Sequence, residues 1–246
     1  ETSIDKAEED MNARQLVDLR VEAETVVKAT EKALANAGHL IGARERAEKG
    51  ELAFGTVDSW LIFNLSGGSL HLTDATNAAR TLLMHLGDCR WDRGMMELFG
   101  VDRSLLPAIT ASYGQLGETE WFGRPIPVTG CAGDQQAAAI GQGCLEPGLV
   151  KVTYGTGAFM IAHAGDTPPV SSNRLLSTVA WQAGDGRAVY ALEGSIFIAG
   201  NLIKWLRDQL GLIGSAAETE ALARSVPDSG GVLMLPALAG LGAPHW

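Results

Sequence analysis

Glycine is distributed very unevenly along the chain, and this distribution constrains the fold more than any other feature of the sequence. The 246 residues include 30 Gly, which is about 12% against a usual ~7%. None precedes Gly38, whereas from Gly50 onward glycines repeatedly interrupt short apolar runs. Because glycine punctuates regular structure, the first segment is predicted to be continuous and the remainder to consist of short elements joined by turns.

The N-terminal segment, which has no glycine before Gly38, has an apolar stripe of helical period. Between residues 8 and 41 apolar side chains recur at spacings of three and four, and charged side chains fill the opposite face. We predict one long amphipathic helix or two shorter ones, which end or break at Gly38. The stripe consists of Leu16, Leu19, Ala23, Val26, Val27, Thr30, Ala33, Leu34, Ala37 and Ile41.

Composition and charge exclude several classes of protein. The chain has 19 Lys and Arg against 29 Asp and Glu, a formal net charge of −10, and 46% hydrophobic residues. A binder of nucleic-acid backbone would need a basic surface, and a disordered chain would be less apolar. At a soft prior of roughly 150 residues per domain, the length allows one large domain or two small ones.

The sequence offers no sign of a membrane span, a disulfide framework or a zinc site. No apolar run approaches the ~20 residues that cross a bilayer, and the first residues lack the apolar core of a signal peptide. Cys89, Cys131 and Cys144 lie far apart without a CxxC pair, and the histidines are scattered singly. We therefore expect a cytoplasmic protein.

Short helices and strands alternate from Gly50 onward, which indicates an α/β fold. Helices are predicted at 54–65, from an N-cap at Thr73 or Asp74, and at 92–98, 135–142 and 195–210. Strands are predicted at 69–72, 125–131, 148–154, 158–164, 175–182 and 188–192. The strand at 125–131 is continuously apolar, which is typical of a strand buried on both faces.

Asp134 stands out on physical grounds. It follows the apolar strand at 125–131 and begins a helix, so it is expected at the carboxyl edge of a sheet, where α/β proteins bind ligands. A carboxylate there can act as a general base. The alternative is that Asp134 only caps the helix.

The segment 153–157 (TYGTG) is the second candidate. Glycines on both sides of Thr156 let backbone N–H groups approach an anion, and the hydroxyl adds a donor. The segment is neither a Walker P-loop nor a dinucleotide fingerprint. An ordinary hairpin turn is the alternative.

Seven short motifs follow one another along the chain: 55–61 (GTVDSWL), 73–81 (TDATNAART), 133–137 (GDQQA), 153–157 (TYGTG), 192–194 (LEG), 205–208 (WLRD) and 236–246 (PALAGLGAPHW). Taken in this order, they resemble the FGGY carbohydrate kinases, and within that family the glycerol kinases. The resemblance runs from about residue 42 to the last residue. It implies two actin-like, ribonuclease-H-like domains with ATP and Mg²⁺ in the cleft between them. Here these domains are incomplete: 43–145 closes the first domain and 146–246 opens the second.

The resemblance also implies roles for individual residues. Asp134 matches the catalytic base, which takes the proton from the terminal hydroxyl of glycerol and holds Mg²⁺ through water. Gln135 matches a glycerol contact. Thr156 and Gly200 match nucleotide contacts, and Lys204 stands on the nucleotide side where the family commonly has Gln. The implied reaction is ATP-dependent phosphorylation of glycerol to glycerol 3-phosphate.

Other family features have no counterpart in the chain. The first phosphate loop is absent, as are the Arg-Glu, Trp and Tyr that complete the glycerol pocket. The segment 121–125 lacks the Gly-rich loop that binds fructose 1,6-bisphosphate in some bacterial members, so this regulation is not expected. The resemblance therefore implies about half of a site and a chain that is weakly active or inactive alone.

Residues 8–41 resemble instead the helical lid of Hsp70-type chaperones, with a join near Gly42. Two alternatives to a glycerol kinase stay open: another FGGY kinase that acts on a different polyol or pentose, and a binding module in which the N-terminal helix is the working part. Glycerol and ATP are the expected partners, and a homo-oligomer is left open.

Overall fold

A computed structural model of the chain describes residues 46–47 and 49–245. The predicted helix at 8–41, which carries the chaperone-lid resemblance, and the whole segment 1–42 lie outside this range. The chain divides into two compact units, one of residues 1–54 and 93–106 and the other of residues 55–92 and 107–246. In the described part of the chain, no helix is long and apolar enough to cross a membrane.

The described part of the first unit is built around helix α5 (Arg93–Phe99), which confirms the helix predicted at 92–98. Gly100 follows with φ of 64°, the left-handed conformation that ends many helices. A short 3₁₀ helix, η2 (Arg103–Leu105), is capped by Asp102, whose carboxylate accepts a 2.7 Å hydrogen bond from the Ser104 N–H.

The second unit starts with α3 (Val57–Leu65), β1 (Leu72–Asp74) and α4 (Ala75–Ala78). Asp74 is the N-cap of α4, as predicted. The strand predicted at 69–72 is wrong in position, because β1 pairs in parallel with β4 (Ala108–Thr110). A distant partner therefore decides where this strand lies, and the local pattern does not.

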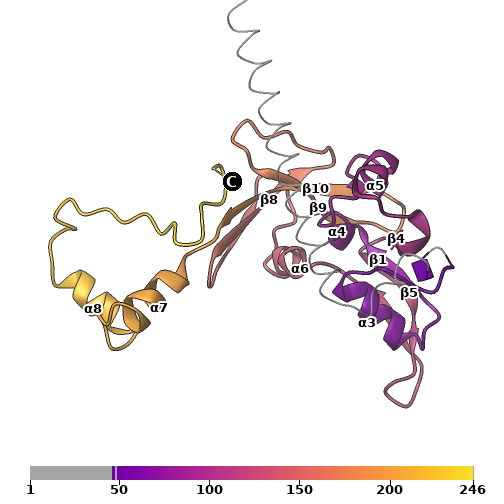
Figure 1. The fold of residues 1–246 in the computed structure, drawn as a ribbon, viewed down its shortest axis with the longest axis horizontal. Helices are drawn as coiled ribbons and strands as arrows, with labels where there is room; N and C mark the ends of the chain where they lie inside the picture. The colour runs from indigo at the N-terminus through magenta and orange to yellow at the C-terminus, as the bar shows by residue number, and fades with distance from the viewer. Residues whose placement is uncertain (1–45, 48, 246) are drawn as a thin grey trace, which may run out of the picture. The chain divides into compact units, whose positions relative to one another are not determined.

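The largest sheet has four antiparallel strands in the order β7-β8-β10-β9. Figure 1 labels three of them, β8, β9 and β10. The strands predicted at 148–154 and 158–164 form one antiparallel pair, and those predicted at 175–182 and 188–192 form another. The last predicted strand ends at Ile196 instead of 192, because Ser195 and Ile196 continue the pairing with β8. The strands are β7 (Val150–Tyr154), β8 (Ala158–Gly165), β9 (Leu176–Gln182) and β10 (Ala188–Ile196).

The strand predicted at 125–131 exists as β6 (Ile126–Gly130), but its predicted burial is wrong. All its residues are half-buried or exposed. The reason is that β6 forms a two-stranded sheet with β5 (Tyr113–Thr119), a strand that the sequence did not predict. A two-stranded ribbon covers far less surface than a strand inside a larger sheet. A second small ribbon pairs β2 (Met84–His85) with β3 (Arg90–Trp91).

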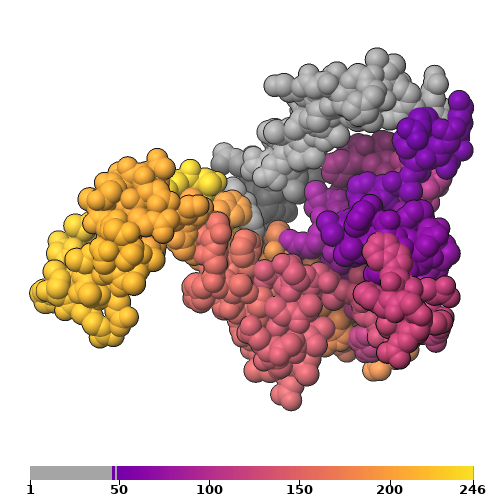
Figure 2. Space-filling model, turned by 90° about the horizontal axis from the view of Figure 1, so that it is seen from below, coloured from indigo at the N-terminus to yellow at the C-terminus, as the bar shows by residue number. Residues whose placement is uncertain are grey.

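Three helices follow β6. The helix predicted at 135–142 is confirmed as α6 (Asp134–Gly141). The helix predicted at 195–210 is confirmed in a shorter form as α7 (Gly200–Asp208), because residues 195 and 196 belong to β10. A further helix, α8 (Glu218–Arg224), was not predicted. Residues 200–245, orange to yellow in Figure 2, keep much of their side-chain surface exposed.

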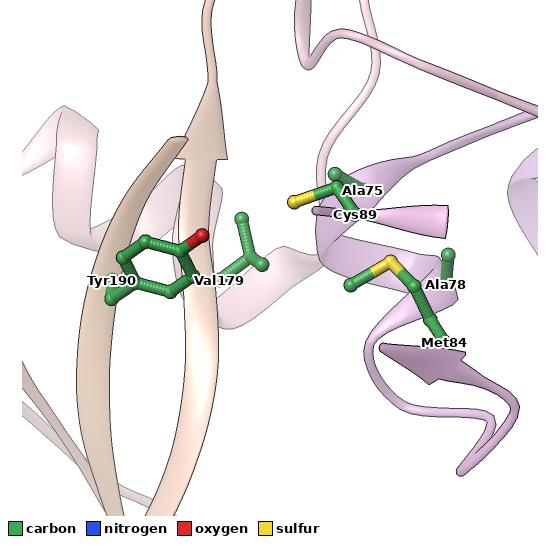
Figure 3. Close-up of a cluster of buried hydrophobic side chains, with 6 residues drawn as sticks. All are labelled: Ala75, Ala78, Met84, Cys89, Val179 and Tyr190. Carbon is green, nitrogen blue, oxygen red and sulfur yellow. The ribbon is translucent and has the colours of Figure 1, made fainter. Parts of the chain in front are cut away.

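Two buried clusters hold the helices against the sheet. Figure 3 shows the first, in which Tyr190 and Val179 of the sheet face side chains of α4, of the short strand at 84–85 and of Cys89. The Tyr190 hydroxyl also donates a 2.9 Å hydrogen bond to the Leu86 carbonyl. The second cluster holds α6 against the sheet. Its buried members are Ala139, Cys144, Ile161, Ala180 and Ala191.

An ion pair reinforces the first contact. Two guanidinium nitrogens of Arg80 lie 2.6 and 3.0 Å from the two carboxylate oxygens of Glu193 on β10. The Glu193 side chain is 8% exposed, so this bidentate pair is shielded from solvent on one side. It connects segments that are 113 positions apart in the sequence.

Candidate active site

Asp134 is the first residue of α6, and its side chain is exposed. One carboxylate oxygen, Oδ1, accepts a 2.9 Å hydrogen bond from the Gln135 N–H, and Oδ2 accepts none from the described residues. The N-cap of α6 is Gly133, and no side chain caps the helix. The capping alternative is therefore wrong, and a carboxylate oxygen of Asp134 is available to a ligand.

The loop before Asp134 is held by a buried polar side chain of α4. The Gly133 N–H donates a 2.8 Å hydrogen bond to Thr76 Oγ1. Thr76 Oγ1 in turn donates to Asp74, at 2.8 and 2.9 Å from its two carboxylate oxygens. The position of Asp134 therefore depends on α4, which is far from it in sequence.

Asp74 is the centre of this network and is fully buried. Its neighbours supply five donor groups, all on uncharged side chains or backbone. These donors are the Thr76 N–H and hydroxyl, the Asn77 N–H and side-chain amide, and the Ser112 hydroxyl. Because a buried carboxylate needs compensating hydrogen bonds, the network explains how Asp74 is tolerated in the core.

Asp58 lies beside Asp74 and belongs to the same network. Its Oδ2 accepts hydrogen bonds from the Thr73 hydroxyl at 2.8 Å and from the Asp74 N–H at 3.2 Å. The Thr56 hydroxyl donates to its other oxygen. The atoms of Asp58, Asp74 and Cys131 that could bind a metal ion, carboxylate oxygens and the thiol sulfur, lie within 4.8 Å of one another. Since the carboxylate oxygens already accept hydrogen bonds, and Mg²⁺ prefers oxygen over thiol ligands, we assign this cluster a structural role.

The Cys131 thiol is expected to react slowly. Burial and the nearby Asp74 and Asp58 carboxylates raise its pKa to about 12. The folded state disfavours the thiolate, so alkylation by iodoacetamide at about pH 8.5 should be much slower in the folded chain than in urea. Peptide mapping by mass spectrometry would measure this. Equal rates in both states would contradict the assignment.

The same pKa has a consequence for stability. The unfolded thiol ionises near its ordinary pKa of 9.0, whereas the folded thiol stays protonated up to about 12. The unfolded state therefore loses this proton first, and the contribution of Cys131 to folding stability falls as the pH rises between these two values.

Gln135 connects α6 to the four-stranded sheet. Its side-chain oxygen, Oε1, lies 2.6 Å from Lys151 Nζ and 3.5 Å from Thr153 Oγ1. Lys151 and Thr153 both belong to β7, the strand that runs into the glycine turn at 155–157. The two candidate features of the sequence, at 134–135 and at 153–157, are therefore joined by direct contact.

The structure brings Thr156 and Gly200 together. The Ala199 and Asn201 N–H groups donate to the Thr156 carbonyl at 2.8 and 3.2 Å, and the Gly200 N–H donates to the Gly155 carbonyl at 2.8 Å. Thr156 itself is exposed. Its own N–H and hydroxyl donate to no group in the described part of the chain, so both can bind an anion at the start of α7.

Lys204 lies one turn further along α7 and is exposed. An exposed ammonium at this position can contribute charge to the same anion site. No hydrogen bond between the described residues joins Asp134 to Thr156, Gly200 or Lys204. The structure thus groups Gln135 with Lys151, and Thr156 with Gly200, while Asp134 points to solvent beside the first pair.

Two polar features beside the candidate site were missed by the sequence analysis. One is the network around Asp74, which was predicted only as a helix cap. The other is Lys151, which is 3% exposed, whereas Val150 and Val152 on the opposite face of β7 are 52% and 40% exposed. Successive side chains of a strand point to opposite faces, so the sequence of β7 could have shown that Lys151 shares a face with Thr153. It could not have shown that this polar face is the buried one.

Comparisons with known proteins agree on one family. A family model described as the N-terminal domain of FGGY carbohydrate kinases matches residues 39–141, and the model of the C-terminal domain matches residues 150–246. A glycerol kinase of Alkalilimnicola ehrlichii is 61% identical over 210 residues, which are 85% of this chain and 42% of that protein. The chain therefore spans less than half the length of this relative.

Solved structures support the fold. The crystal structure of Plasmodium falciparum glycerol kinase with ADP matches with a TM-score of 0.76 and 36% identity, over 87% of this chain and 42% of that one. A ligand-bound xylulose kinase of Lactobacillus acidophilus matches with a TM-score of 0.65 and 22% identity, over 77% and 39% of the two chains, and shows the fold alone. The predicted incomplete α/β, actin-like kinase fold is confirmed. The comparisons favour the glycerol kinases over the alternatives.

Proposed function

The chain belongs to the FGGY family of carbohydrate kinases, and on this premise we propose that it contributes to the ATP-dependent phosphorylation of glycerol. The observation that carries the proposal is the exposed carboxylate of Asp134 beside Gln135, which contacts the strand leading to the glycine turn. A 61% identical relative is a glycerol kinase, which supports glycerol as the acceptor.

Asp134 acts as the general base. As the terminal hydroxyl oxygen of glycerol attacks the γ-phosphorus of ATP, its proton passes to the free carboxylate oxygen of Asp134, Oδ2. The bond between the γ-phosphorus and the bridging oxygen breaks, and ADP leaves with that electron pair. Gln135 holds the polyol beside Asp134, because positioning supplies much of the catalysis in phosphoryl transfer.

The nucleotide is held by the glycine turn and the start of α7. The N–H and hydroxyl of Thr156 donate to phosphate oxygens, Gly200 lets the two backbones approach, and Lys204 adds positive charge. Mg²⁺ commonly keeps several waters when it binds carboxylates and phosphates, so Asp134 would hold it through one of these waters, and Oδ2 would stay available for the proton. When bound, Mg²⁺ supplies neutralisation of the phosphate charge.

Gly200→Ala should disrupt the nucleotide side. A Cβ at Gly200 would lie 2.6 Å from the Gly155 carbonyl oxygen, so the turn or the helix must move. We expect a stability loss of about 1–3 kcal/mol and a loss of at least about tenfold in ADP affinity, measured by urea unfolding and by calorimetry. Gly141→Ala is the control, because a Cβ there meets nothing within 4 Å. Equal ADP affinity of the two variants would contradict the assignment.

The proposal is tested by incubating the full chain with [γ-³²P]ATP, Mg²⁺ and glycerol, and separating the products. Labelled glycerol 3-phosphate is the expected product, in greater yield than the products from xylulose or gluconate. A higher yield from one of the other acceptors would favour a different FGGY kinase. Absence of turnover together with absence of ATP and glycerol binding would overturn the proposal.

The proposal extends to the domain boundary, the compartment and the partners of the protein. The boundary between the two kinase domains falls at 145/146, between the two matched segments. The protein acts in the cytoplasm, where its three free cysteines would stay reduced. Its partners are the small molecules glycerol and ATP. A sedimentation measurement would decide whether it forms a homo-oligomer.

A further inference from the structure

A buried lysine decides which end of the Gln135 side-chain amide faces the substrate. Lys151 is 3% exposed, and its Nζ lies 2.6 Å from Gln135 Oε1. A lysine ammonium has three donors and no acceptor, so the amide must turn its oxygen toward it. We propose that Lys151 is a positioning residue that presents the Gln135 amide nitrogen, Nε2, as a hydrogen-bond donor to a polyol hydroxyl. This inference rests on the proposed function.

A second donor acts on the same oxygen. The Thr153 hydroxyl lies two residues along β7 from Lys151 and approaches Gln135 Oε1 at 3.5 Å. Nε2 donates no hydrogen bond within the residues that the structure describes. Both Nε2 hydrogens are therefore available, and the two β7 side chains together oppose a flip of the amide.

Lys151 is not explained by stability. Among the described residues it forms no ion pair, and a buried ammonium without a carboxylate is costly. Its strand register places it opposite Ile161, which lies opposite Glu193. Glu193 is two strands away and is already paired with Arg80 at 2.6 Å. An apolar residue would suit this buried position better, so the role of Lys151 lies in its contact with Gln135.

The chemistry favours a ligand with adjacent hydroxyls. The Asp134 carboxylate acts only as a hydrogen-bond acceptor. The Nε2 group of Gln135, whose amide is oriented by Lys151, acts only as a donor. One hydroxyl of a vicinal diol can give its proton to Asp134 while the oxygen of the next hydroxyl accepts from Gln135. If the amide were free to rotate, its oxygen would face that hydroxyl part of the time, and the donor would be lost.

The hydrogen bond itself is tested by NMR on the ¹⁵N-labelled full chain. The Gln135 side-chain amide signal is identified by its disappearance in Gln135→Glu. In Lys151→Met this signal should shift and broaden, while the backbone amides of α6 stay near their positions. Lys49→Met removes an exposed lysine outside the site and should leave the signal unchanged. An unmoved Gln135 signal in Lys151→Met would overturn the proposal.

The role in substrate binding is tested by glycerol titration of the same signal. Lys151→Met should weaken glycerol binding about tenfold, as expected for one lost donor, with an unchanged or higher urea midpoint. Lys151→Arg, which also offers only donors, should recover most of the affinity. A parallel loss of stability and affinity would mean a merely structural role and would overturn the proposal. If glycerol does not move the Gln135 signal of the unaltered chain, the proposed function fails, and the polyol role of Lys151 fails with it. The NMR comparison still reports the Lys151–Gln135 bond separately.

Discussion

Replacing Asp134 by Asn is expected to lower the rate of phosphoryl transfer by about 10²–10⁴-fold and to leave the fold intact. Asparagine keeps the size of the side chain and an oxygen that can accept the Gln135 N–H, but it cannot take the proton of the attacking hydroxyl. Because Asp134 is exposed and caps no helix, its charge contributes little to stability. A large loss of rate with little change in stability is the result expected for a general base.

The measurement is the initial rate of glycerol 3-phosphate formation, with circular dichroism to verify folding. Asp166→Asn is a matched control, since Asp166 is also exposed and lies outside the site. Glycerol affinity should change far less than the rate, because the proton moves only during the reaction. Turnover by Asp134→Asn at the rate of the unaltered chain would show that Asp134 is not the base.

Replacing Asp74 by Ala is expected to have the largest effect on stability, about 3–5 kcal/mol. The substitution removes a fully buried carboxylate and leaves five donor groups without their acceptor. It also releases Thr76, which accepts the Gly133 N–H beside Asp134. Since domains are typically stable by about 5–15 kcal/mol, this loss is a large fraction of the folding free energy.

Urea unfolding followed by circular dichroism measures this loss. Asp102→Ala is the control, because Asp102 also accepts hydrogen bonds from a backbone N–H and a hydroxyl, but at an exposed cap. Its loss should cost about 1 kcal/mol. Similar losses of unfolding free energy in both variants would show that the buried network does not hold the loop before Asp134.

The predicted elements that survived in the structure are those whose signals are local. The strands on either side of residues 155–157 were predicted because their apolar and β-branched residues and the glycines between them lie next to each other in sequence. The helix found at 134–141 was predicted at 135–142, shortly after the apolar strand at 125–131. Such turns and caps depend on a few consecutive residues, so a single sequence contains them.

The predictions that failed depended on distant partners. The start of α7 was placed too early because Ser195 and Ile196 pair with β8, and β6 was predicted to be buried although it has β5 as its strand partner. Pattern alone does not tell which strand a segment will meet. The same applies to β1, whose position follows from its pairing with β4.

The sequence by itself determined the reactive groups and their local setting: Asp134 where a strand meets a helix, Thr156 between two glycines, and the order of motifs that indicates the kinase family. Only the tertiary structure decided that Lys151 points inward to Gln135 and that Gly200 packs on the glycine turn. The physical reason is that backbone conformation is set by neighbouring residues, whereas burial and side-chain contacts are set by strand register and packing between residues far apart in the chain.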